Sequence, residues 1–283
     1  MNIKSQNSGS TSTQTELFDD CDLTIESALC IYDGETIITP PPTIENLILF
    51  LTFDQQNTLD QSGNGNHATG SGERGPGYFL SRGYSGHFRG ERNIEIPASD
   101  SLNGAFANEF SLSFWVYVNT LGTLTTEQCD IISKGTQGST PFEFSIDVVT
   151  RELMVTTTTE ESGPITVNSN ARLQNQRWTH VALTRSTNLM VLYVNGNLDA
   201  VIEVSQGRST ASNPLHVGRM PWQDSVGGGC NIDFFIDEFK VWNNVILESW
   251  IEAESGIALG TGIDPHSIQL GCINCSFTRA QNS

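Results

Sequence analysis

Short apolar segments that alternate with polar turns run through most of the chain. In Arg177–Glu203 (RWTHVALTRSTNLMVLYVNGNLDAVIE), two apolar, β-branched runs flank Asn195-Gly196. Both positions of a type I′ turn need φ > 0, which Asn and Gly tolerate, so this pattern predicts a two-residue hairpin within an antiparallel meander. The predicted register pairs Tyr193 with Leu198, and Val191 with Ala200.

Period-two patterns predict the other strands. Phe110–Val118 (FSLSFWVYV) places Phe or aliphatic residues on one face, while Trp115 and Tyr117 on the other face are expected to form a second packing layer. Further strands are predicted at residues 47–54, 84–88, 93–97, 130–135, 142–148, 152–159, 214–219 and 232–242, with a helical turn at 247–254. Roughly twelve strands without a βαβ pattern predict an all-β, two-sheet antiparallel jelly-roll sandwich.

The two ends of the chain differ in composition from this β region. Residues 1–43 are rich in Ser, Thr and Gln and end in Pro40-Pro41-Pro42, so we expect a disordered lead and linker before a domain at 44–256. Residues 257–283 are expected to form a short tail, in which Gly271–Ser276 resembles the opening of a Cys-rich region. The first residues lack the apolar core of a signal peptide, so in an extracellular or cell-surface protein either the signal has been removed or the chain is a fragment of a longer one. The Cys-containing segment 271–276 favours a fragment.

The charge of the chain restricts its partners. Asp and Glu number 32 against 14 Lys and Arg, which gives a net charge of −18. Nucleic acid is excluded as a partner because phosphate contacts need Lys and Arg. No apolar run reaches the roughly 20 residues of a membrane span, so no membrane insertion is expected in this segment.

Six cysteines favour disulfides in a chain of this composition. Spacing alone leaves the pairing open. The interpretation adopted is Cys21–Cys30 as a local loop, Cys129–Cys230 within the β domain, and Cys272–Cys275 with each other or with partners outside this chain. A zinc site at Cys272-x-x-Cys275 is the alternative, but no second ligand pair completes it.

Several segments together carry a family resemblance. They are WTHVALT at 178–184, LYVNGNL at 192–198, LDQSGNGNHA at 59–68, IISKG at 131–135 and IDEFKVW at 236–242. In their order along the chain they resemble the laminin-G-like domains of the concanavalin A-like lectin/glucanase type, relatives of the pentraxins, over about residues 46–254. The resemblance implies a jelly roll whose first and last strands lie close together.

Calcium is the expected cofactor, and Asp54, Asp60 and Asp237 are its predicted ligands. Ca²⁺ takes carboxylate and carbonyl oxygens from loops. Alternation places Asp237 on the inward face with Phe239 and Val241, where an unpaired carboxylate is costly. The resemblance implies that Asp54 and Asp237 share one ion. The alternative is that these carboxylates accept hydrogen bonds from the backbone.

Catalytic patterns are weak in this sequence. Glycoside hydrolysis needs two carboxylates about 5–10 Å apart, whereas Asp233 and Asp237 lie four residues apart on one strand, about 13 Å at the usual rise. Glu143 stands alone, and His180 is interpreted as a hydrogen-bonded, half-buried residue rather than a base. Trp222, in a predicted loop, is the candidate ligand-binding residue; it either stacks on a sugar ring or folds over the glycines at 227–229.

The sequence therefore favours a non-enzymatic extracellular module for recognition or adhesion. Its expected partner is a glycan or an extracellular protein, with a structural calcium ion. A glycoside hydrolase, or the accessory carbohydrate-binding domain of one, is the first alternative. An architectural spacer in a large ectodomain or filament is the second.

Overall fold

The structure is a computed structural model, and it separates into two compact units, Met1–Pro41 and Pro42–Ser283. In the first unit, β1 (Cys30–Tyr32) pairs antiparallel with β2 (Glu35–Ile37). The described residues are 30–32, 35–37, 46–54, 58–70, 72–78, 83–90, 92–107, 109–120, 128–136, 139–159, 163–204, 212–218, 220 and 232–256. The rest of the predicted lead and the whole predicted tail, together with Cys21, Trp222, Cys230, Cys272 and Cys275, lie outside these ranges.

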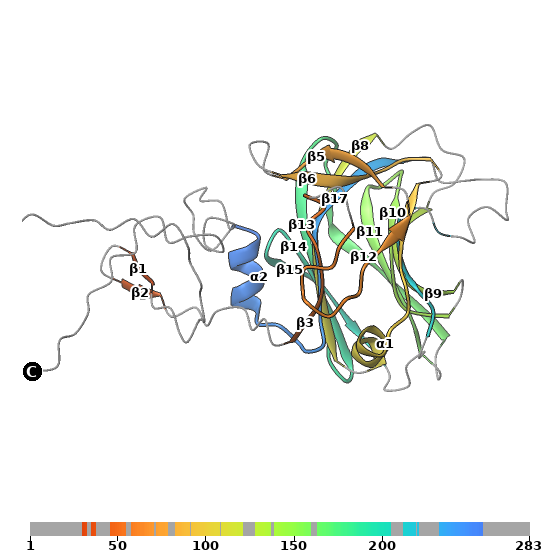
Figure 1. Ribbon diagram of the computed structural model, residues 1–283. Coiled ribbons are helices and arrows are strands. Elements are labelled where there is room, and N and C mark those ends of the chain that lie inside the picture. Colours follow the sequence, from red (N-terminus) through yellow and green to blue (C-terminus); the bar gives the residue numbers. More distant parts are fainter. Residues whose placement is uncertain are drawn as a thin grey trace, which may run out of the picture. The chain divides into compact units, whose positions relative to one another are not determined.

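The second unit is a sandwich of two antiparallel sheets (Figure 1). One sheet has seven strands in the order β12-β11-β10-β9-β16-β7-β4. These strands are β4 (Thr69–Gly70), β7 (Asn93–Ile96), β9 (Gln128–Thr136), β10 (Ser139–Asp147), β11 (Glu152–Thr159), β12 (Gly163–Arg172) and β16 (Leu215–Gly218). The predicted fold class, an all-β two-sheet sandwich, is confirmed.

The other sheet has eight strands. Seven follow the order β15-β14-β13-β8-β17-β6-β5, and β3 also pairs with β17. They are β3 (Leu47–Leu51), β5 (Glu73–Pro76), β6 (Tyr84–Phe88), β8 (Phe110–Thr120), β13 (Trp178–Arg185), β14 (Leu189–Val194), β15 (Asn197–Glu203) and β17 (Asp233–Trp242). Leu51 lies opposite Phe239, so the first and last strands of the sandwich are neighbours, as the resemblance implied. Two helices, α1 (Asp100–Ala107) and α2 (Glu248–Glu254), complete the described elements.

The core lies between the two sheets and follows the predicted alternation. Phe110, Leu112 and Phe114 of β8 are fully buried, and Phe114 packs edge-on against Phe144 of the opposite sheet, with ring centroids 5.3 Å apart. The intervening residues of β8 therefore point away from the core, toward the outer face of the eight-stranded sheet.

The hairpin forms at Asn195-Gly196, where φ is 49° and 77°. Tyr193 lies opposite Leu198, as predicted. Val191, however, lies opposite Val201 rather than Ala200, because the register shifts by one residue between Leu192 and Tyr193. A β-bulge of this kind adds one residue to one strand, and the turn signal does not encode it.

A second irregularity corrects the orientation of Asp237. The pairing of β17 with β8 shifts between Asp237 and Lys240, and Glu238 has φ of 51°. As a result Asp237 lies opposite Trp115 on the outer face, whereas Phe239 is in the core. The prediction that Asp237 shares the inward face is wrong because the bulge reverses the alternation.

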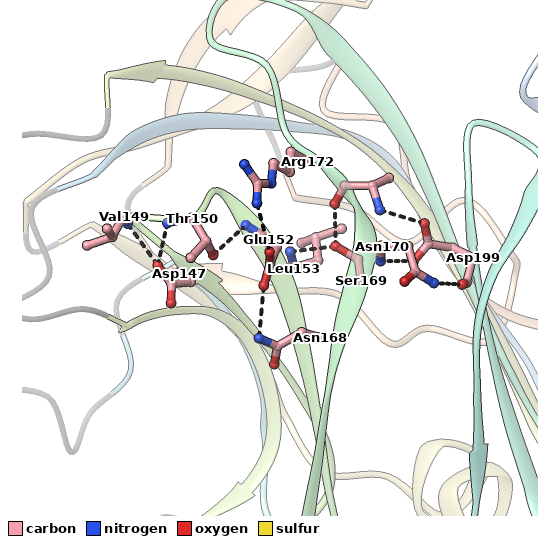
Figure 2. Close-up of polar contacts among 11 residues, drawn as sticks. Asp147, Val149, Thr150, Glu152, Leu153, Asn168, Ser169, Asn170, Arg172 and Asp199 are labelled. Atoms are coloured by element: carbon pink, nitrogen blue, oxygen red, sulfur yellow. Dashed lines mark hydrogen bonds and ion pairs between the residues drawn. The ribbon is translucent and has the colours of Figure 1, made fainter.

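At one rim, Asp199 of β15 links the two sheets (Figure 2). Its Oδ2 accepts a hydrogen bond from Asn170 N at 2.7 Å, and its Oδ1 accepts one from Ala171 N at 2.8 Å. Asn170 Nδ2 in turn donates to the Asp199 carbonyl. At the same rim, Asp147 Oδ1 accepts hydrogen bonds from the backbone N–H groups of Val149 and Thr150, in the turn between β10 and β11. The carboxylates here hold backbone in place.

Candidate functional site

Four aromatic side chains form a row across the outer face of the eight-stranded sheet. Trp178 of β13 lies opposite Tyr117 of β8, Tyr117 lies opposite Phe235 of β17, and Phe235 lies opposite His87 of β6. Side chains in direct cross-strand register on one face are in contact. We call Trp178, Tyr117, Phe235 and His87 the aromatic row.

The rings of the aromatic row contact one another in sequence. His87 stacks on Phe235 with centroids 4.3 Å apart, Tyr117 meets the same ring edge-on at 5.5 Å, and Tyr117 and Trp178 are 5.4 Å apart. Phe235 is buried, while the other three rings are half-buried. A Cβ atom on Gly75 of β5 would overlap the Phe235 ring, so the absence of a side chain there lets this ring lie against the strand. The row thus offers three partly exposed rings, and the buried Phe235 ring contacts two of them.

Tyr78 forms a second layer beside the row. Its ring stacks on Trp115 at 3.6 Å and meets Trp178 edge-on at 5.9 Å. Trp115 is only 4% exposed, so its expected role in a packing layer agrees with the structure. Tyr117, expected in the same layer, instead belongs to the aromatic row.

Polar groups line the His87 end of the row. Asp233 Oδ1 lies 2.6 Å from His87 Nε2, and Asp233 Oδ2 accepts a hydrogen bond from Asn119 Nδ2 at 2.9 Å. Glu73 lies 3.5 Å from His87 Nδ1 and 3.3 Å from a guanidinium nitrogen of Arg89. These bonds fix the orientation of the carboxylates, and carboxylate oxygens accept more than one hydrogen bond each.

This arrangement combines ring faces with oriented hydrogen-bonding groups. Binding sites for small molecules use apolar and aromatic surface for contact and a few placed polar groups for orientation. Half-buried aromatic rings offer large contact area at low entropic cost. The site therefore suits a ligand that has both an apolar face and many hydroxyl groups.

Asp60, a predicted metal ligand, is committed to the backbone of its own loop. Its Oδ1 accepts hydrogen bonds from Phe50 N and Ser62 N, both at 2.9 Å, and its Oδ2 accepts them from Ser62 Oγ at 2.8 Å and Asn66 N at 2.9 Å. Four donors fill the acceptor sites of a carboxylate. Asp60 therefore does not fit a calcium ligand.

Asp54 and Asp237 lie near each other. Asp54 Oδ1 accepts a hydrogen bond from Tyr84 N, and Asp237 accepts bonds from Tyr78 N and Glu238 N, each at 2.9 Å. Burial raises the pKa of Asp237 to about 8, although the hydrogen bond from Tyr78 N acts to lower it. The negative charges of Glu238 and Asp54 add to the rise. Within the described ranges, no group of three or more His, Cys, Asp or Glu side chains is placed to hold a metal ion.

Glu143 lies on the outer face of the seven-stranded sheet. It sits between Ser133 of β9 and Thr156 of β11 in cross-strand register. Burial and the nearby Asp130 raise the pKa of Glu143 to about 7, partly offset by a hydrogen bond with Ser133. Glu143 therefore has a carboxylate neighbour that the sequence did not reveal.

His180 is fully buried under α2, and its Nε2 lies 3.5 Å from Glu254 Oε2, so it is more enclosed than the half-buried residue expected. Cys129 is disulfide-bonded. Residue 230 lies outside the described ranges, so the pairing of Cys129 with Cys230 stays a prediction. Trp222 also stays untested as a ligand-binding residue.

Comparison with known proteins agrees with the arrangement of the sheets. A family model described as the concanavalin A-like lectin/glucanases superfamily matches residues 88–252, which is more than half of the chain. The chain belongs to this superfamily. A comparison with curated protein sequences finds no match.

The solved structures that match in fold include toxin binding domains. The binding domain of Paraclostridial Mosquitocidal Protein 1 matches with a TM-score of 0.62 at 18% identity, covering 75% of this chain and 52% of that one. The binding domain of botulinum neurotoxin DC matches in complex with rat synaptotagmin II (TM-score 0.60, 17% identity, 76% and 52% covered) and in complex with SialylT (0.59, 19%, 75% and 52%). The chain spans about half the length of these domains, and at such identities the likeness shows the fold.

The aromatic row could have been found in part from the sequence. Tyr117 alternates with core residues of β8, and Phe235 lies between the apolar residues Phe234 and Ile236 of β17. The sequence therefore indicated two aromatic side chains that face outward. Their meeting with His87 and Trp178 depends on the order of four strands that are distant in sequence. The sequence indicated individual outward-facing aromatic residues but not that they meet in one row.

Proposed function

We propose that this protein is a non-enzymatic, extracellular recognition module that binds a glycan through the aromatic row. The observation that carries the proposal is the cross-strand register that joins Trp178, Tyr117 and His87 through Phe235 of β17. Asp233 and Asn119 lie beside this row. The faces of sugar rings carry C–H groups that pack on aromatic rings, and their hydroxyl groups bond to oriented carboxylates and amides.

The comparisons support this proposal. The superfamily includes lectins, and the similar toxin domains are binding domains, one in complex with SialylT. The described residues also contain no helix long and apolar enough to cross a membrane. The proposed extracellular location rests on a composition that is rich in turn residues and in which only 16% of the residues are charged.

The test is binding of the full chain to an array of neutral and acidic glycans, followed by calorimetry with one that binds. Trp178→Ala and Tyr117→Ala should each raise the Kd about tenfold, equivalent to ~1.4 kcal/mol. Thr166→Ala, an exposed position on the other sheet, is the matched control and should leave the Kd unchanged. Binding that survives both aromatic changes would rule out the row, and no binding to any glycan would favour the architectural spacer.

We retain calcium as a proposal for Asp54 and Asp237 only. A cation between them would offset the repulsion that contributes to the raised pKa of Asp237. Mass spectrometry for metal content, together with melting curves with and without EGTA, tests this directly. An absent metal and an unchanged melting temperature would remove the site.

Glycoside hydrolysis is the second candidate function, and the Glu143–Asp130 pair is the observation that favours it. A carboxyl group whose pKa is raised to about 7 can donate a proton to a leaving oxygen, while a second carboxylate activates water or attacks. A reducing-sugar assay on polysaccharides tests this candidate. Turnover that is lost in Glu143→Gln would establish the enzyme, and its absence in the wild type would favour the binding module.

A further inference from the structure

Exposed apolar side chains gather beside helix α2, away from the aromatic row. Of the eight exposed large apolar residues in the described part of the chain, five lie on β14, β15 or the segment that leads into α2. They are Leu189 (39% exposed), Leu198 (55%), Val201 (50%), Val245 (38%) and Leu247 (61%). We call these five the apolar patch.

The members of the apolar patch share one surface. Val201 lies opposite Val191, and Leu198 lies opposite Tyr193, on the outer face of the eight-stranded sheet. Val191 and Tyr193 belong to a small cluster with Ile251 of α2. Ile246, between Val245 and Leu247, packs against the same cluster. Figure 1 shows α2 lying beside β14 and β15. The exposed residues therefore surround one small buried cluster.

Negative charge borders this surface. Glu203 lies opposite Leu189 in the β14–β15 pairing. Glu248 is exposed at the first turn of α2, close enough to Tyr193 for its charge to act on that hydroxyl. Residues 189–204 and 243–256 contain no Lys or Arg. The border is thus acidic, and these two stretches contribute no cation to it.

We infer that the apolar patch is a docking surface for a basic amphipathic segment of a partner protein, with apolar side chains that cover the patch and Lys or Arg opposite Glu203 and Glu248. Clustered exposed apolar residues with a polar rim mark interaction sites. Complementary charge selects the partner, because like charges across an interface are costly. A second copy of this chain would bring the same acidic border against itself.

The experiment measures binding of two labelled 18-residue peptides to the full chain by fluorescence anisotropy. Both peptides have Leu at helical positions i, i+3, i+4 and i+7; one carries Lys elsewhere and the other Glu. The Leu/Lys peptide should bind, and Leu198→Ser/Val201→Ser should raise its Kd at least tenfold. Val149→Ser, at a residue 72% exposed in the β10–β11 turn, is the matched control and should not change the Kd.

A second pair of variants separates local charge from net charge. Glu203→Lys should weaken binding of the Leu/Lys peptide more than Glu95→Lys, which makes the same change in net charge on the seven-stranded sheet. Equal effects of these two variants, or equal binding of both peptides, would overturn the inference. So would a dimer, seen by analytical ultracentrifugation, that is lost in Leu198→Ser/Val201→Ser, because the occupant would then be a second copy. None of these outcomes depends on glycan binding.

Discussion

The Nζ atom of Lys240 lies 2.5 Å from Oε1 of Glu254, and both side chains are buried between β17 and α2. Ser113 Oγ donates a hydrogen bond to the other Glu254 oxygen at 3.0 Å, and Glu238 lies 3.2 Å from the same ammonium group. A buried carboxylate with an ammonium and a hydroxyl partner is satisfied in the folded state. This cluster therefore holds α2 on the outer face of the eight-stranded sheet.

Glu254→Gln should destabilise the fold strongly. Removing one partner of a buried ion pair typically costs about 3–5 kcal/mol, because it leaves a buried charge with less compensation. Glu238 still faces Lys240 at 3.2 Å, so we expect a loss at the lower end of this range. Urea unfolding measures the loss. The control is Glu152→Gln, whose carboxylate lies 3.7 Å from Arg172, a side chain 68% exposed; this change should cost less than about 1 kcal/mol. Equal losses in the two variants would show that the buried cluster does not anchor α2.

The same carboxylate should make the fold sensitive to acid. Burial alone would raise the pKa of Glu254, but Lys240 and His180 outweigh it and lower the pKa to about 2, from 4.5. The stabilisation is therefore complete above pH 4.5 and is lost as the pH falls through 2. The difference in unfolding free energy between wild type and Glu254→Gln should shrink over this window. A difference that stays constant from pH 6 to pH 2 would contradict the assignment.

Gly75→Ala should disturb the aromatic row. The added Cβ would overlap the Phe235 ring, and forcing extra volume into packed surroundings costs about 1–3 kcal/mol. Thermal melts and glycan binding should both decline. Gly104→Ala is the control, because open space surrounds this position in α1, and replacing a helical glycine stabilises by about 0.5–1 kcal/mol. Normal glycan binding by Gly75→Ala would separate the row from the ligand.

Local signals in the sequence predicted local structure well. The alternation in β8 and the Asn195-Gly196 turn specify which residues face the core and where the hairpin closes, because both depend on neighbouring residues. The register beyond Leu192 and the face of Asp237 depend on bulges, which arise where a strand adjusts to its partners. The aromatic row required the same non-local knowledge of strand order, so the sequence pointed instead to Trp222.

Asp60→Ala should destabilise the loop that follows β3, whether or not calcium is present. The change leaves the N–H groups of Phe50 and Asn66 without their acceptor, and each buried, unsatisfied donor costs about 1–3 kcal/mol. Melting temperatures of wild type and variant should differ by the same amount in calcium and in EGTA. A difference seen only in calcium would return Asp60 to the metal ligands.

Glu143→Gln should change how stability depends on pH in the opposite direction to Glu254→Gln. Burial and Asp130 raise the pKa of Glu143 from 4.5 to about 7, so the fold favours the protonated acid. Its contribution is full below pH 4.5 and is lost as the pH rises through about 7. The unfolding free energy of the wild type should therefore fall relative to Glu143→Gln across this window. Asp130→Asn should move the window to lower pH by removing one cause of the rise. A wild-type curve parallel to that of Glu143→Gln from pH 4 to pH 8 would show an ordinary surface carboxylate, and would remove the observation that favours hydrolysis.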